Sequence, residues 1–334
     1  MRRWVSTAVI WIGIVCVSIT SAVAQSSAQE EEEDSESSST AQEALPQMAI
    51  KPARQLPQVT IEADRQALRQ RVSHFVRTVT TQVGSYESLA RWGVKVCPMT
   101  TGLSAPQNDF VMQRISTIAQ AAGIPVEATG CKPNLRVMIT SDPARLIKKM
   151  WSDNPDQFVD LSGERATASE VGRFMEDPRP IRAWYGVELV GAMGNELGSY
   201  NEMPTRSRVP RANRMPTMSR LRNDDLQSIR STLVVVDKGR IVGQHLGAVA
   251  DYVALVGLAE VNLAGDYSSA ESILRLFTAP ENGESITELS AWDAAFLKAV
   301  YATDQSSKFH LTAIVEKMMK DPETVPVTSG IAPP

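Results

Sequence analysis

Apolar and polar positions recur with a clear period over most of the chain after residue 57. Spacings of three and four residues predict helices, and alternation or short β-branched runs predict strands. The expected helices are 62–80, 106–122, 143–151, 167–175, 244–263, 269–277, 289–303 and 308–319. The expected strands are 94–96, 135–140 and 181–190, followed by a hairpin of 233–236 and 241–242 around a turn at 237–240.

Strands fall in the first two-thirds of this pattern and helices in the last third. We therefore expect an α+β fold: a small mixed sheet with helices packed on it and a helical C-terminal third. The second helix places Phe110, Ile115, Ile118 and Ala122 near one face, and Gly123 is expected to end it. Asp142, which is followed by proline, is placed to cap the start of the third helix.

Residues 1–24 have the pattern of a signal peptide. Two arginines precede a charge-free apolar stretch, and Ala22 and Ala24 stand at the positions that signal peptidase reads. We expect cleavage before Gln25, which would make the protein periplasmic or secreted. The alternative is a retained membrane anchor, for which the apolar stretch is somewhat short.

The charge is unevenly distributed along the chain. Residues 25–57, rich in Ser, Glu and Gln, are expected to form a disordered acidic linker, and seven acids but no base lie within 30–43. The formal net charge of −4 is therefore not the charge of the rest of the chain, which we call the body. The body holds the other 31 of the 38 acids and, once Arg2 and Arg3 are set aside, 32 of the 34 bases. A nearly neutral body disfavours a nucleic-acid partner.

The rest of the chain is expected to form a single α+β domain over 58–322, with a flexible tail at 323–334. At 43% hydrophobic and 22% charged residues, the chain can form a sizeable core. Two cysteines, Cys97 and Cys131, remain after the signal peptide is removed, and in an oxidising compartment such a pair predicts one disulfide. The alternative is two buried free thiols.

Residues 201–222 are rich in Arg and Pro and are expected to form a long loop between two strands. The arginines of this loop are Arg206, Arg208, Arg211, Arg214, Arg220 and Arg222. They could bind phosphate or carboxylate groups, so an anionic envelope component or protein is one candidate partner. Single-strand nucleic-acid grooves interleave aromatic residues, and this segment has none. The alternative is a surface flap without a ligand.

The helix expected at 244–263 is apolar nearly all round, which predicts that it is buried. Asp251 lies inside it and has no charged neighbour one turn away. A buried carboxylate needs a partner, so a donor must come from elsewhere in the chain. We interpret Asp251 as a structural carboxylate bonded to backbone or to a loop arginine; a catalytic role is the alternative.

The C-terminal region is similar to a known group of proteins. Its segments are Ser-Ile-Leu-Arg-Leu-Phe at 272–277 and Leu-Ser-Ala-Trp-Asp-Ala-Ala-Phe-Leu-Lys-Ala-Val-Tyr at 289–301. They follow a sheet, a hairpin and a buried helix that ends in Gly-Leu. This combination resembles uncharacterised exported bacterial proteins with a zincin-like, that is metalloprotease-like, domain. The resemblance spans residues 90–320 and implies a fold without an established activity.

The zinc motif of active zincins is not present. Such a site needs two histidines one turn apart on a helix and a glutamate beside the first. With Gly257 placed on the glycine of the long motif, the ligand positions fall on Ala250, Ala254 and Glu260, and the base position falls on Asp251. Methyl groups cannot bind zinc, so we expect a degenerate zincin-like domain without a metal or another cofactor.

Three functions are compatible with these features. The leading expectation is a non-catalytic binding or scaffolding domain of the cell envelope. One alternative is a hydrolase that uses Asp251 and Glu260, with Glu188 or His245, as acid and base without a standard zinc site. His245 is otherwise interpreted as a solvated residue of the helix's first turn. The second alternative is an envelope adaptor that binds anionic partners through the arginine-rich loop.

Overall fold

The structure is a computed structural model that describes residues 57–80, 89–159, 165–191, 221–223, 225–278, 286–322 and 324. Contacts divide the chain into two units, Met1–Arg54 and Gln55–Pro334, and every described residue belongs to the second. The expected signal peptide and most of the expected acidic linker, arginine-rich loop and C-terminal tail therefore lie outside the described residues.

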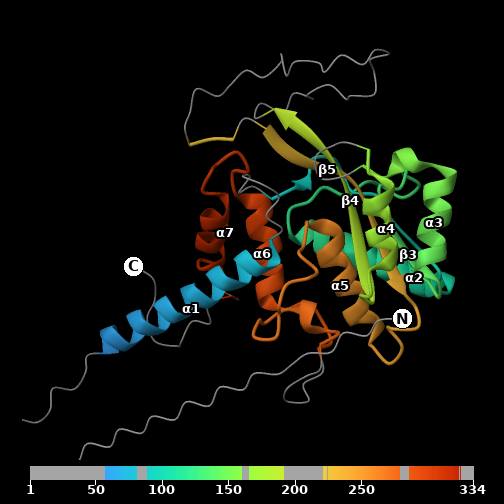
Figure 1. The fold of residues 1–334 in the computed structure, drawn as a ribbon. Helices are drawn as coiled ribbons and strands as arrows, with labels where there is room; N and C mark the ends of the chain where they lie inside the picture. Colours follow the sequence, from blue (N-terminus) through green and yellow to red (C-terminus); the bar gives the residue numbers. More distant parts are fainter. Residues whose placement is uncertain are drawn as a thin grey trace, which may run out of the picture. The chain divides into compact units, whose positions relative to one another are not determined.

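One mixed sheet organises the described part of the chain (Figure 1). Its strands are β1 (Arg91–Trp92), β2 (Pro98–Thr101), β3 (Leu135–Thr140), β4 (Ile181–Gly191) and β5 (Asp225–Asp237). Strand β5 pairs in parallel with β1 and β3 along one side and antiparallel with β4 along the other. Strand β2 extends the sheet by pairing in parallel with β3. The expected mixed sheet is confirmed.

Helices cover both faces of this sheet. They are α1 (Pro57–Val79), α2 (Ala105–Ala121), α3 (Pro143–Asp153), α4 (Ala168–Glu176), α5 (Leu246–Leu258), α6 (Ala291–Ala302) and α7 (His310–Met318). Figure 1 shows α3 and α4 on the opposite side of β4 and β5 from α5. Alternate residues of β5 divide between the two layers: Val234 and Val236 join the larger core with α2 and α5, whereas Leu233 and Val235 join a smaller core with α3 and α4. This alternation is the period of two that a strand imposes.

The C-terminal third is helical, as expected. Helix α7 packs on α6 and on the long helix α1. Phe75 of α1 forms edge-on aromatic contacts with Trp292 and Phe296 of α6. The α+β expectation for the fold is therefore confirmed in its sheet, its covering helices and its C-terminal helices.

Two strand predictions were wrong. The expected strand 94–96 is displaced: β1 ends at Trp92, β2 begins at Pro98, and Val96 forms only an isolated bridge with Val126. The expected hairpin after β5 is absent, because Asp237 ends the strand and its side chain accepts a hydrogen bond from the Gly239 N–H. Val242 is 78% exposed. The antiparallel partner of β5 is β4, which precedes it in the chain.

One helix prediction also needs correction. Only a 3₁₀ turn, η3 (Ile273–Arg275), forms within the expected helix 269–277. The Ser272 hydroxyl and the Ile273 N–H both donate to Asp293 of α6, which fixes this segment by tertiary bonds instead of helical ones. In α2 the buried stripe begins at Val111, and Phe110 remains 42% exposed.

The predicted disulfide is present between Cys97 and Cys131, with a Cα–Cα distance of 6.1 Å. It joins the start of β2 to the turn that precedes β3. Asn134 reinforces the same connection, because its side-chain oxygen accepts a hydrogen bond from the Cys97 N–H at 2.7 Å. Within the described residues, none of the helices is both long enough and apolar enough to cross a membrane.

Candidate functional site

The carboxylate singled out in the sequence, Asp251, lies in the middle of α5 and has no exposure to solvent. Both of its oxygens are hydrogen-bonded. The Arg114 guanidinium of α2 donates from Nε to Oδ1 and from Nη2 to Oδ2, the latter at 2.7 Å. The Leu289 N–H also donates to Oδ2 at 2.7 Å. Asp251 therefore ties α5 to α2 and to the segment before α6.

The two partners of this ion pair differ in their access to water. The Arg114 side chain is 37% exposed, so part of it reaches solvent, whereas the Asp251 side chain is closed to it. The hydrogen bond to Asp251 raises the pKa of Arg114, against a smaller opposing effect of burial. The expected backbone donor is present as the Leu289 N–H, and the arginine donor lies on a helix, where we expected a loop. Local sequence patterns do not indicate which residues pair when they lie 137 positions apart.

The other two candidate residues lie at opposite ends of α5. His245 precedes the helix and is exposed, as the solvated interpretation expects. Glu260 follows the helix and is 2% exposed. Thirteen residues of helix span about 20 Å, so the two ends are far apart. Glu188, on β4, is paired with Arg230 of β5. The structure therefore does not bring these acids and His245 together.

The positions that the resemblance assigned to zinc ligands are packing positions. Ala250 and Ala254 are fully buried. A Cβ atom added at Gly257 would lie 3.1 Å from the Leu135 side chain, so glycine allows α5 to approach β3 closely. In the part of the chain that the structure describes, no group of three or more His, Cys, Asp or Glu side chains could hold a metal ion.

Five of the six loop arginines, from Arg206 to Arg220, lie outside the described residues. Arg222 is described and forms an ion pair with Asp304 at 3.6 Å. It also bridges Ser307 through the backbone. This arginine is therefore held against the segment between α6 and α7.

A feature that sequence reasoning missed is the polar cap on the C-terminal end of α5. Helices leave their last carbonyl groups without intrahelical partners, and here three aromatic side chains donate to them. The bonds run from Tyr185 Oη to the Val256 oxygen (2.8 Å), from Trp92 Nε1 to the Gly257 oxygen (3.0 Å) and from Tyr301 Oη to the Leu258 oxygen (2.5 Å). Burial raises the pKa of both tyrosines, so they remain neutral donors.

Comparisons with known proteins found no family model, no curated protein and no solved structure that matches the chain. The geometry described above is therefore the basis for any statement about function.

Proposed function

We propose that the chain is an exported, non-catalytic binding module of the cell envelope with a degenerate zincin-like layout. The observation that carries this proposal is the engagement of Asp251. Its two oxygens receive three hydrogen bonds from Arg114 and Leu289, and its side chain is closed to solvent. A catalytic carboxylate must reach a substrate proton or a water molecule, and this carboxylate is committed to holding helices together.

The order of elements supports the zincin-like part of the proposal. A mixed sheet precedes a buried helix, α5, which ends in Gly257 and Leu258 and is followed by further helices. The positions aligned with zinc ligands hold the methyl groups of Ala250 and Ala254. These are the features expected of a scaffold that has kept its frame without its metal ligands.

The disulfide supports the exported part. Disulfides persist in oxidising compartments and are rare in the reducing cytosol, so the Cys97–Cys131 bond fits a periplasmic or secreted protein. N-terminal sequencing of the protein recovered from the cell envelope should begin at Gln25. A mature chain that retains residues 1–24 would contradict export with cleavage.

The non-catalytic part is tested by elemental analysis and a peptidase assay on the purified mature protein. We expect no stoichiometric transition metal and no cleavage of a denatured protein substrate. The hydrolase alternative requires activity that disappears in the D251N variant. D266N is the matched control, because Asp266 is an exposed acid on a loop.

The outcomes separate the two functions. Cleavage that D251N abolishes while its melting temperature stays unchanged, and that D266N retains, would establish the hydrolase and overturn the binding module. One equivalent of tightly bound metal would overturn the degenerate-site proposal as well.

A further inference from the structure

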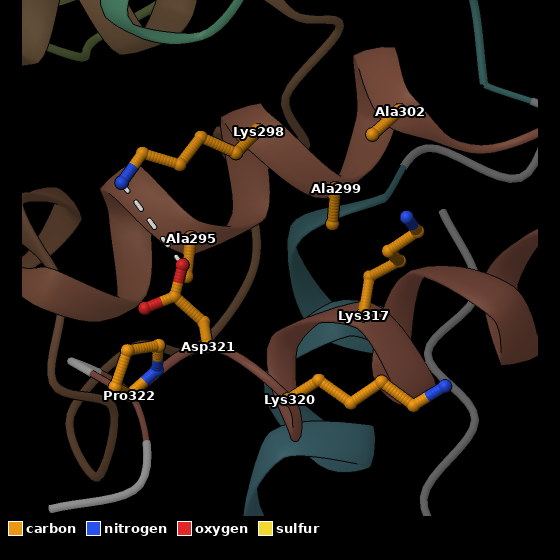
Figure 2. Close-up of a pocket in the computed structure, with 8 residues that line it drawn as sticks. All are labelled: Ala295, Lys298, Ala299, Ala302, Lys317, Lys320, Asp321 and Pro322. Carbon is orange, nitrogen blue, oxygen red and sulfur yellow. Dashed lines mark ion pairs between the residues drawn. The ribbon is translucent and has the colours of Figure 1, made fainter.

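The C-terminal helices form a hollow whose positive charge is only partly balanced within the protein. Its volume is about 270 Å³, and it is lined by Ala295, Lys298, Ala299, Ala302, Lys317, Lys320, Asp321 and Pro322. Figure 2 shows the three alanines on the side of α6 that faces the end of α7, with lysines around them. We propose that this hollow binds a phosphate group, with Lys298, Lys317 and Lys320 supplying the charge and the alanines the floor.

The balance of charge in the hollow is positive. Three lysines line it against one acidic residue, Asp321, whose carboxylate lies 4.0 Å from the Lys298 nitrogen, the outer limit of an ion pair. Among the described residues, Lys317 and Lys320 have no carboxylate within ion-pair distance. Both are exposed, near the end of α7, where the helix dipole adds a small favourable interaction but no discrete partner.

The shape of the hollow follows from the sequence of α6. Ala295, Ala299 and Ala302 are spaced by four and three residues, so their methyl groups share one face of the helix. Larger side chains at these positions would fill the space between α6 and the end of α7. In Figure 2 the Lys317 side chain extends toward Ala299 and Ala302, and the Lys298 side chain extends toward Asp321.

The chemistry of the lining selects the class of ligand. Lysine provides compact point charges with rotatable donors, which suit a tetrahedral phosphate with two negative charges, whereas planar carboxylates are better matched by the arginine fork. The volume lies just below the roughly 300–1,000 Å³ of pockets for drug-sized ligands. A single phosphate group with a short apolar attachment fits this description. Its source is either a soluble phosphomonoester or a lipid headgroup.

A second hollow, lined by Arg71, His74 and Trp292 among others, differs in this respect. The Arg71 guanidinium already pairs with Glu271 at 2.5 Å and stacks on the Trp292 ring. The Arg71 charge is therefore balanced by Glu271 within the protein. In the first hollow, Lys317 and Lys320 have no such partner among the described residues, so their charge is available to a ligand.

The proposal deepens the binding function proposed above and rests on it. The test is calorimetric titration of the folded protein at low salt with inorganic phosphate and with glycerol 3-phosphate. Vesicles of phosphatidylcholine with and without phosphatidic acid distinguish a headgroup from a soluble ligand. We expect saturable phosphate binding that the K317Q/K320Q variant weakens by about tenfold or more, because each charge-assisted hydrogen bond contributes more than about 1.4 kcal/mol.

Two further variants separate a built site from general charge attraction. K148Q/K149Q removes the same charge from an exposed face of α3 and should change the affinity less than about twofold. A302L keeps every charge but fills part of the hollow, and it should weaken binding as well. Unchanged melting temperatures confirm that the variants are folded.

Three results would overturn the site: no saturable binding, equal weakening by the two lysine double variants, or wild-type affinity in A302L. Binding only to vesicles that contain phosphatidic acid, lost in K317Q/K320Q, supports the site and identifies the headgroup as the source. The metal and peptidase assays are independent of these titrations. Failure of phosphate binding therefore removes this site alone, and detection of peptidase activity removes the non-catalytic function alone.

Discussion

Buried polar side chains define this protein at the scale of the residue, because each connects segments that are distant in the chain. Asp251 binds Arg114, and Asp293 accepts hydrogen bonds from Ser272 and the Ile273 N–H. Burial raises the pKa of Asp293, and these hydrogen bonds oppose that effect. A buried polar group that loses its partner carries its full desolvation cost, so such residues are sensitive points for stability.

The Arg114–Asp251 pair gives the first prediction. R114M leaves a fully buried carboxylate without its cation, so it should lower the free energy of unfolding by about 2–3 kcal/mol. This loss is at or just below the range for breaking a fully buried ion pair, because Arg114 is partly exposed. The double variant R114M/D251N should recover part of this loss, since neutral asparagine still accepts from the Leu289 N–H. Urea denaturation measures both, with R145M on the exposed face of α3 as the control. Equal losses in the single and double variants would contradict a charge-based role.

His310 gives a prediction about pH. The ring is fully buried at the start of α7; Nδ1 accepts from the Leu89 N–H at 3.4 Å, and Nε2 lies 2.9 Å from the Thr303 hydroxyl. Burial, with a smaller contribution from nearby Arg91, lowers the pKa of His310 from 6.5 to about 4, and Asp304 opposes this weakly. The folded protein therefore holds His310 neutral under conditions in which the unfolded chain is protonated.

The consequence is a loss of stability in acid. Between pH 6.5 and about 4 the unfolded state binds one more proton at this position, so stability is complete above pH 6.5 and falls as the pH decreases. The total for this residue is about 3 kcal/mol. Urea denaturation from pH 7.5 to 4 should show a shallower decline in H310Q than in the wild type. H74Q, at an exposed histidine, should follow the wild type; the same slope in H310Q and the wild type would rule out this coupling.

At the scale of the element, α5 is positioned by its surroundings on every side. Its apolar faces pack against α2, the sheet and α6, and its last carbonyl groups are bonded by aromatic side chains. The Tyr301 hydroxyl has two roles, because it donates to Leu258 and accepts from the Trp92 N–H at 3.2 Å. The helix end is thereby fastened to β1, β4 and α6 together.

This arrangement predicts that removing the Tyr301 hydroxyl, which bonds the end of α5, lowers stability more than removing a tyrosine hydroxyl from the middle of α5. Y301F should lower the free energy of unfolding by about 2 kcal/mol, because two buried backbone groups lose their partner. Y252F is the matched control, since Tyr252 lies in the middle of α5 with its ring against Phe277. Thermal or urea unfolding compares the two. A loss in Y252F as large as in Y301F would show that the helix end is not the cause.

At the scale of the whole described domain, one sheet with helices on both faces brings together elements from the full length of 57–322. The long strand β5 is central because it contacts β1, β3 and β4. Polar residues Gln227 and Ser228 in its first half are buried between neighbouring strands. The Cys97–Cys131 bond adds a covalent link between the start of β2 and the turn that precedes β3.

The disulfide gives a prediction for global stability. Cross-linking residues 34 apart in sequence restricts the unfolded chain, and C97S/C131S should lower the free energy of unfolding by about 3–4 kcal/mol. Thermal denaturation with and without reductant should reproduce this difference in the wild type but not in the variant. Alkylation of the unreduced, denatured wild-type protein at either cysteine would contradict the bond.

Features with a local cause can be predicted from the amino-acid sequence alone. The limits of β3, the cap of α3 by Asp142 and the end of α2 at Gly123 were all predicted, because they depend on residues only a few positions apart. The Asp142 side chain accepts from the Arg145 N–H at 2.9 Å, and Gly123 has a φ of +80°. The disulfide partners followed from counting, since two cysteines leave one pairing.

Features that depend on distant partners follow from the three-dimensional packing of the elements. Asp251 needed a donor on physical grounds, but α2 supplies it from a residue 137 positions earlier in the chain. Asp293 accepts hydrogen bonds from the Ser272 segment that the local pattern predicts as a helix, and pairing with β1 and β4 makes the polar half of β5 a strand. Periodicity indicates which face of an element is buried, but it does not indicate which other element covers that face. The packing of α2 on α5 creates the Arg114–Asp251 pair, and the packing of α7 on α6 creates the hollow lined by lysines.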